Sequence, residues 1–175
     1  MHSIDLFVNN YFLLNRTDFL VQIMHFITDL FGSTIYFAVI ISLVFLLVYK
    51  LKGLKYGLLF LGAVASSIVV IQSLKLFSDV SRPLNGAIEV TGQSFPSNHA
   101  TTATVFFMML IYIFDDYFRP FERKIFNLVC IFGIFLIAFS RVYLGVHWFS
   151  DVFWGIMLGL FISYILVHLF HSRKN

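Results

Sequence analysis

Charged residues are scarce in this sequence. Only 12% of its 175 residues are Asp, Glu, Lys or Arg, whereas 59% are hydrophobic, and a soluble domain carries about 25% charged residues. No stretch is polar enough to fold as a separate soluble unit. We therefore expect a membrane protein with one membrane-embedded domain over residues 1–175.

Three further absences exclude other classes of protein. The single cysteine, Cys130, excludes an intramolecular disulfide. The 12 basic residues are scattered in twos and threes and form no stripe that could follow a nucleic acid, so we expect no nucleic-acid partner. The first residues, MHSIDLFVNNYF, lack a positively charged leader and a cleavage site, and we expect no removable signal peptide.

Long apolar runs fill most of the chain instead. A helix needs about 20 residues to cross the hydrocarbon layer. Five runs approach this length, namely 34–49, 56–77, 98–114, 125–139 and 148–170. A sixth run, 17–31, contains Asp18, Gln22, His25 and Asp29, which would form one polar face that packs inward or lies in the interface. The sequence thus predicts an all-α bundle of about six transmembrane helices.

The basic residues predict the orientation of these six helices. With a cytoplasmic N-terminus, nine of them fall on the cytoplasmic side: Arg16, Lys50, Lys52, Lys55, Arg119, Arg123, Lys124, Arg173 and Lys174. Lys75, Arg82 and Arg141 are left for the outer side, which agrees with the excess of positive charge in cytoplasmic loops. The long connection 78–97 is then an ordered loop on the outer face.

The two outer connections contain almost every polar group with catalytic potential. The first holds Lys75, Asp79, Arg82, Ser97, Asn98 and His99, and the second holds Arg141, His147 and Asp151. Ionisable groups near membrane depth are costly, and their default interpretation is functional. Three cations and two histidines on one face indicate an anionic substrate.

His147 and Asp151 lie four residues apart at the start of the last apolar run and would share a helix face. A carboxylate there can fix the tautomer of the imidazole and leave its other nitrogen free as a nucleophile or base. The alternative is an interfacial histidine beside Trp148 in an aromatic belt, with Asp151 stabilised by the helix macrodipole.

His99 lies at the start of a run that is entered through Pro96, with Ser97 as the expected N-cap. Free N–H groups at a helix start bind phosphate oxygens, so this turn can hold an anion with His99 beside it as a proton donor. The alternative is a capped helix with a surface histidine.

The three outer cations fall at different places in the expected structure. Pro83 disfavours helical geometry at Arg82, so Lys75 would end a helix and Arg82 would lie in the loop. The chain must turn after Arg141, and Gly145 is the expected turn residue. An Arg presents a planar fork to phosphate oxygens and a Lys presents a compact charge. Alternatively, each cation extends to the membrane interface as a snorkelling side chain.

Three motifs resemble the signatures of the type 2 phosphatidic acid phosphatase family. KLFSDVSRP (75–83), PSNH (96–99) and SRVYLGVHWFSD (140–151) are similar in order and spacing to K-x6-R-P, P-S-G-H and S-R-x5-H-x3-D. The resemblance implies a six-helix membrane lipid phosphatase. Soluble vanadate-dependent haloperoxidases share these motifs, but this apolar chain does not resemble them overall.

The resemblance also implies a role for each residue. His147 would attack phosphorus to form a phosphohistidine, Asp151 would orient it, and His99 would protonate the leaving oxygen. The phosphoryl oxygens would be held by Lys75, Arg82, Ser97, Asn98 and Arg141. Because protein cations surround the phosphate, no metal or cofactor is implied. A neutral His147 with a protonated His99 predicts a bell-shaped pH dependence of the rate.

Asn98 departs from the Gly of the second motif. If the position needs a positive φ, Asn is a tolerated replacement that keeps its backbone N–H. Bacterial undecaprenyl-diphosphate phosphatases also often have a polar residue there, as in F-P-S-D-H. We therefore expect a multi-pass enzyme of the bacterial cytoplasmic membrane whose outward-facing site acts on undecaprenyl diphosphate.

Other functions stay open at this point. Phosphatidylglycerol phosphate and the 1-phosphate of lipid A are alternative substrates within the family. From another class, a transporter or lipid-binding scaffold would hold the phosphate without cleaving it. The substrate in each case is a lipid phosphate or diphosphate, with membrane lipids as the surroundings.

Overall fold

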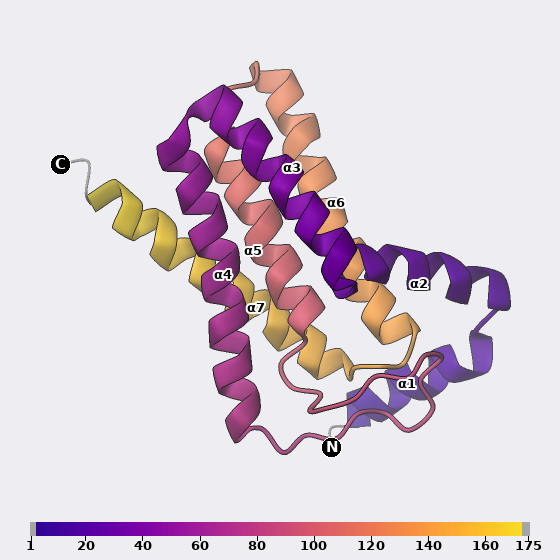
Figure 1. Cartoon of the computed structure of the whole chain (residues 1–175). Coiled ribbons are helices and arrows are strands. Elements are labelled where there is room, and N and C mark those ends of the chain that lie inside the picture. The colour runs from indigo at the N-terminus through magenta and orange to yellow at the C-terminus, as the bar shows by residue number, and fades with distance from the viewer. Residues whose placement is uncertain (1–2, 173–175) are drawn as a thin grey trace.

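Helices make up the regular structure of this computed structural model, which describes residues 3–172 (Figure 1). They are α1 (Ser3–Asn15), α2 (Asp18–Gly32), α3 (Thr34–Lys52), α4 (Leu54–Phe77), α5 (Asn98–Ile113), α6 (Pro120–Tyr143) and α7 (Phe149–Ser172). No β-strand occurs within the described residues. The predicted all-α membrane bundle is confirmed.

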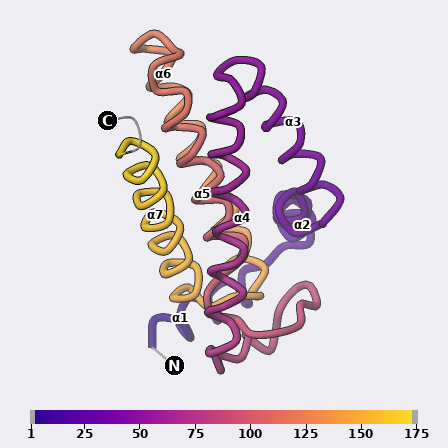
Figure 2. Tube along the Cα trace, turned by 60° about the vertical axis from the view of Figure 1, so that its left-hand side comes forward, coloured from indigo at the N-terminus to yellow at the C-terminus, as the bar shows by residue number. Residues whose placement is uncertain are grey.

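The central helix of the bundle is α5. It packs against α4, α6 and α7, which run beside it in both views (Figures 1 and 2). Its residues Phe106 and Met109 share one buried core with Phe60 of α4. Gly159 of α7 allows a close approach to α5, because a Cβ at this glycine would lie 2.6 Å from the Cβ of Thr104. Small residues at helix interfaces are a general device of membrane bundles.

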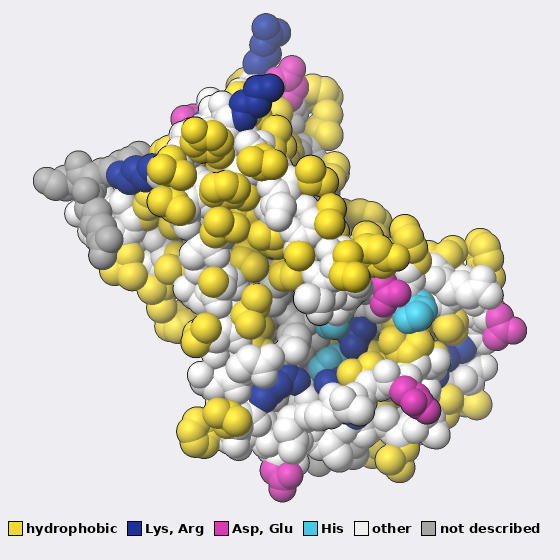
Figure 3. Space-filling model, in the orientation of Figure 1, with side chains coloured by type: hydrophobic (Ala, Val, Ile, Leu, Met, Phe, Trp, Pro, Cys, Tyr) yellow, Lys and Arg dark blue, Asp and Glu magenta, His cyan; other side chains and the backbone are white. Residues whose placement is uncertain are grey.

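The bundle presents apolar side chains to its surroundings. Four helices, α3, α4, α6 and α7, are long and apolar enough to cross a membrane, and α5 is a shorter apolar helix among them. Leu43, Phe135 and Phe161 are examples of large side chains exposed on the outside of this bundle, and hydrophobic side chains cover much of its visible face (Figure 3). Apolar patches of this extent mark a surface that contacts lipid, so we treat α3–α7 as the membrane-crossing part.

The first two helices depart from the prediction. The described residues contain seven helices instead of six, because α1 was not expected at all, and it is too short, at 13 residues, to have left the signal of a membrane span. The predicted sixth span is α2, which lies across one end of the bundle instead of along it (Figures 1 and 2). Its 15 residues and polar face fit the interfacial alternative better than a full crossing.

Arg16, between α1 and α2, lies on the other side of the molecule from where the charge count placed it. Its Nη1 atom donates to the carbonyl of Asn85, 2.7 Å away in the connection 78–97. Arg16 and α1 therefore lie at the same end as this connection, and the prediction of six spans with the first helix at the opposite end is wrong. The other described basic residues of the cytoplasmic group lie at the two turns of the opposite end, α3–α4 and α5–α6: Lys50, Lys52, Lys55, Arg119, Arg123 and Lys124. Arg173 and Lys174 lie outside the described residues.

Candidate functional site

The connection 78–97 and the turn between α6 and α7 meet at one end of the bundle. The amide of Ala87 donates to the carbonyl of Leu144 at 2.8 Å, and the indole Nε1 of Trp148 donates to the carbonyl of Ser81 at 2.7 Å. Gly145 turns the chain with a φ of +65°, as its place in the third motif predicted. Histidine, lysine and arginine side chains gather in a hollow at this end of the molecule (Figure 3).

All eight residues that the motifs predicted are found around this hollow. Lys75 is in the last turn of α4, Arg82 is in the connection, and Arg141 is in the last turn of α6. Ser97 is the N-cap of α5, followed by Asn98 and His99. His147 precedes α7, and Asp151 is in the first turn of α7. The Nη1 atom of Arg82 is 3.1 Å from Nε2 of His147, and the backbone N–H of Ser97 donates to the carbonyl of Asp151 at 3.2 Å, so the three motifs meet in a single site.

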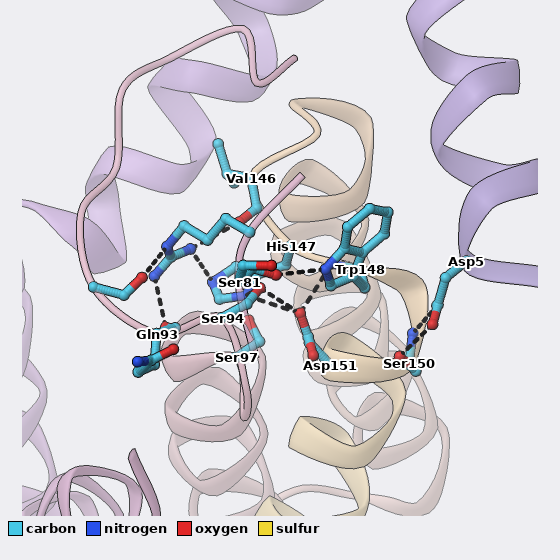
Figure 4. A network of polar contacts seen from close by, with 12 residues as sticks. Asp5, Ser81, Gln93, Ser94, Ser97, Val146, His147, Trp148, Ser150 and Asp151 are labelled. Carbon is cyan, nitrogen blue, oxygen red and sulfur yellow. Dashed lines mark hydrogen bonds and ion pairs between the residues drawn. The ribbon is translucent and has the colours of Figure 1, made fainter. Parts of the chain in front are cut away.

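The hydrogen bonds around His147 define its tautomer. The Nη1 atom of Arg82 is 3.1 Å from Nε2 of His147, and because a guanidinium can only donate, Nε2 must accept. The ring proton is therefore on Nδ1, which faces Oδ2 of Asp151 at 3.6 Å and Oγ of Ser94 at 3.3 Å (Figure 4). The Nε2 lone pair thus points to the cationic side of the site, as a nucleophile for an anionic substrate requires.

Burial keeps His147 neutral. It lowers the pKa of this histidine from its ordinary value of 6.5 to about 4, because the charged imidazole loses its hydration, and the nearby charges of Arg141 and Arg82 lower the pKa further. The negative charge of Asp151 acts in the opposite direction. At neutral pH the ring is therefore uncharged and keeps a lone pair on Nε2.

Asp151 is fixed by two hydrogen bonds and is only 1% exposed. Its Oδ2 atom accepts from Oγ of Ser94 at 2.5 Å and from the backbone N–H of Trp148 at 3.0 Å. His147 and Trp148 do not form an aromatic belt at the membrane surface. Both side chains are buried, and the indole of Trp148 donates a hydrogen bond to the connection 78–97.

Polar atoms without a partner converge where α5 begins. Four buried side-chain atoms here have no hydrogen-bond partner within residues 3–172: Ser97 Oγ, Asn98 Oδ1, His99 Nε2 and Arg141 Nε. Ser97 occupies the predicted N-cap position, but its side chain makes no capping hydrogen bond. Buried polar atoms are paired in the great majority of cases. A cluster of unpaired ones beside the free N–H groups of a helix start is what an anion-binding site provides.

The conformation of Asn98 differs from the conditional prediction. Asn98 is the first residue of α5, and within the described residues only glycines have a positive φ. The position therefore needs no left-handed conformation in this chain, since it is already part of the helix. What Asn98 adds is an amide side chain at the edge of the site.

The three cations are held by the protein backbone and by α2. Arg82 donates to the carbonyls of Gly92, Gln93 and Val146, and burial lowers the pKa of this guanidinium from its ordinary value. The Nζ atom of Lys75 donates to the carbonyl of Gln93 at 2.5 Å. These bonds restrain the cations and leave further N–H donors for a ligand.

Two residues of α2 complete the site, and neither was predicted from the sequence. The hydroxyl of Thr28 accepts from Nη1 of Arg141 at 2.6 Å. Gly32, the last residue of α2, lies against His99, because a Cβ at this glycine would be 2.7 Å from His99 Nε2. A third missed residue is Ser94, which precedes the second motif and contacts both His147 and Asp151.

An apolar groove leads away from the site between α3 and α4. It has a volume of about 620 Å³ and is lined mainly by apolar side chains, among them Phe37, Ile41, Leu61 and Ile68. Asn98 also lines it. The groove therefore reaches the first residue of α5, which also belongs to the cluster of polar atoms.

Comparisons with known proteins agree with this geometry. The sequence model of the PAP2 superfamily matches residues 56–175. Phosphatidylglycerophosphatase B of Bacillus subtilis (strain 168) is 28% identical over 170 residues, which are 95% of this chain and 83% of that protein. Among solved structures, the first transmembrane PAP2 type phosphatidylglycerolphosphate phosphatase from Bacillus subtilis has a TM-score of 0.87 at 25% identity, covering 97% of this chain and 86% of that one.

A second solved structure is similar in fold. LpxE of Aquifex aeolicus has a TM-score of 0.78 at 20% identity, covering 95% of this chain and 96% of that one. The likeness extends beyond the three motifs to nearly the whole chain, so the arrangement of the helices around the hollow is common to these proteins.

Proposed function

Because the chain belongs to the PAP2 superfamily, as its three motifs predicted, we propose that this membrane phosphatase removes the terminal phosphate of a lipid phosphate through a phosphohistidine at His147, without a metal ion. The observation that carries the proposal is that the three motifs, with their two histidines and three cations, meet in one hollow beside an apolar groove. The cations and helix N–H groups suit a phosphate, and the groove suits a hydrocarbon chain.

In the first step, the Nε2 lone pair of His147 forms a bond to phosphorus, and the bond from phosphorus to the lipid oxygen breaks. A proton passes from His99 to that oxygen, so the lipid leaves as an alcohol or as the shorter phosphate. The imidazole gains positive charge as the new bond forms. The carboxylate of Asp151, 3.6 Å from Nδ1, stabilises that charge.

In the second step, water attacks the phosphohistidine. His99, now neutral, takes a proton from the water, and the bond between Nε2 and phosphorus breaks with return of the electron pair to His147. Inorganic phosphate leaves and both histidines are restored. Charge is spread over the three equatorial oxygens in both transition states, and Lys75, Arg82 and Arg141 stabilise it there.

The distribution of charge supports an active site on the outer face of the bacterial cytoplasmic membrane. Two lysine- and arginine-bearing turns lie at the end opposite the site (Figure 1), and positive turns favour the cytoplasmic side. The cations at the site end are accounted for by phosphate binding and, for Arg16, by the contact with Asn85.

Phosphatidylglycerol phosphate is our first candidate substrate, because the relative that is 28% identical over 95% of the chain is a phosphatidylglycerophosphatase. Undecaprenyl diphosphate is the second candidate, and Asn98 favours it: the amide lies between the groove and the phosphate site, where the second phosphate of a diphosphate would pass. The 1-phosphate of lipid A is the third candidate substrate.

A panel assay tests the substrate class. Purified protein in detergent micelles is given each of the three lipids, and released phosphate is measured with and without EDTA. We expect release from at least one lipid at a rate that EDTA does not change. Binding of all three lipids without release from any would favour the transporter or scaffold, and loss of release in EDTA would refute the metal-free chemistry.

Replacement of the nucleophile tests the mechanism. His147→Ala should abolish release and keep lipid binding, whereas the control His168→Ala should behave as wild type, since His168 is exposed near the far end of α7. Acid-labile phosphate should be trapped on the control and not on His147→Ala. Equal release from both variants would show that His147 is not the nucleophile.

A further inference from the structure

Ser94 stands between the nucleophilic histidine and its carboxylate. Its Oγ atom is 2.5 Å from Oδ2 of Asp151 and 3.3 Å from Nδ1 of His147. Both distances are shorter than the 3.6 Å between Nδ1 and Oδ2 themselves. Figure 4 shows Ser94 in the connection beside His147 and Asp151. The direct contact is too long for a hydrogen bond, so the hydroxyl is the group that links the two.

The direction of each hydrogen bond follows from the available donors. An ionised Asp151 can only accept, so the single proton of the Ser94 hydroxyl is donated to it. His147 has its proton on Nδ1, because Arg82 donates to Nε2, and Nδ1 therefore donates to a lone pair of Oγ. The resulting chain runs from Nδ1–H to Oγ–H to Oδ2, and each donor in it has an acceptor.

We propose that Ser94 is a positioning residue of the phosphatase, whose hydroxyl relays the hydrogen bond of Asp151 to His147 and so holds Nε2 toward the phosphate. The inference rests on the proposed function of His147 as nucleophile. Ser94 neither touches the phosphate nor gains or loses a proton in the cycle. When Nε2 bonds to phosphorus, the Nδ1–H bond polarises toward Oγ, and the hydroxyl passes that polarisation to the carboxylate.

Within residues 3–172, the Ser94 hydroxyl makes no hydrogen bond besides these two. Ser94 is 0% exposed, and its place in the connection is held by its backbone, whose N–H donates to the carbonyl of Val80 at 2.8 Å. Substitution of the side chain leaves that backbone bond in place. A smaller side chain should therefore preserve the loop and remove only the relay.

Ser94→Ala and Ser94→Cys test the proposal, with Ser67→Ala as the control. Ser67 is also 0% exposed, and its hydroxyl donates to the carbonyl of Val64 within the same helix, α4. Loss of a hydrogen bond to a charged group corresponds to roughly a 10- to 100-fold change. We expect kcat to fall about tenfold or more in both Ser94 variants, with KM and melting temperature close to those of Ser67→Ala. The Cys variant makes the same comparison should the Ala variant not fold, because a thiol fills the space but is a weak donor.

A double variant shows whether Ser94 acts through Asp151. In an Asp151→Asn background, followed with radiolabelled substrate, Ser94→Ala should cost less than about twofold, because the relay already lacks its carboxylate. The proposal is overturned if kcat matches that of Ser67→Ala, if KM rises while kcat holds, or if the full loss recurs in the Asp151→Asn background. Failure of the wild-type enzyme to release phosphate from any lipid would instead refute the proposed function.

Discussion

Substitution of Gly32 by Ala should reduce activity without reducing stability. A Cβ at this position would lie 2.7 Å from His99 Nε2, and a relaxed contact needs about 3.5 Å. The imidazole must therefore shift by roughly 0.8 Å, and a 1 Å misplacement of a reacting group can cost about 100-fold in rate. We expect kcat/KM to fall by a factor on the order of 10 to 100.

Stability should change in the opposite direction. The atom that Cβ meets is the far end of a side chain, which can move, and the φ of Gly32 is not positive. Replacing a helical Gly by Ala gains up to about 1 kcal/mol within a helix and less at its end, so the free energy of unfolding should stay the same or rise slightly.

Gly62→Ala is the matched control, since nothing lies within 4 Å of a Cβ at that helical glycine of α4. Initial rates on a short-chain lipid phosphate and unfolding in detergent are measured for both variants. Equal kcat/KM in Gly32→Ala and Gly62→Ala would refute the placement of His99 against α2. A drop in stability with the drop in rate would show that Gly32 has a structural role instead.

Three further changes test other parts of the site. Thr28→Val keeps nearly the same side-chain shape but removes the hydroxyl that accepts from Arg141. The value of kcat/KM should fall roughly tenfold, as expected for a lost hydrogen bond to a charged group. An unchanged kcat/KM would mean that Arg141 needs no support from α2. His147 is active when neutral, and burial lowers its pKa to about 4. After correction for ionisation of the substrate phosphate near pH 6, kcat/KM should therefore persist as the pH falls below about 6.5, the ordinary pKa of histidine. Loss of half of kcat/KM at pH 6.5 or above, from a group on the enzyme, would contradict the burial of His147. Asp5→Ala removes the carboxylate that accepts from the N–H and the hydroxyl of Ser150, each at 2.8 Å. The free energy of unfolding, measured by denaturation in detergent, should fall by about 1 kcal/mol, as for other lost helix caps.

Local rules were enough to predict where several residues of the candidate site lie. The proline before Ser97 and the glycine after Arg141 define a helix start and a turn, and both are found where expected. The spacing of His147 and Asp151 predicted one shared helix face, whereas His147 precedes α7 and Asp151 lies in its first turn; their side chains still face each other, with Nδ1 3.6 Å from Oδ2. These segments meet at one end of the bundle, where Arg82 faces His147.

Contacts between distant segments could not be predicted in the same way. Thr28 and Arg141 are 113 residues apart, and Asp5 and Ser150 are 145 apart, so neither pairing leaves a periodic signal. The position of α2 was ambiguous for a physical reason, because a short helix with one polar face can either pack inward or lie in the interface. The charge count then placed Arg16 on the wrong side.

The transverse position of α2 has a consequence for how the chain is threaded through the bilayer. With α1 and α2 at the site end and α3–α7 crossing, the number of crossings is odd, so Ser3 and Ser172 lie on opposite faces (Figure 1). A reporter that is active in only one compartment should therefore be active in one of two fusions, before α1 or after α7, and inactive in the other. A label attached before α1 would share its compartment with the phosphate that the enzyme releases.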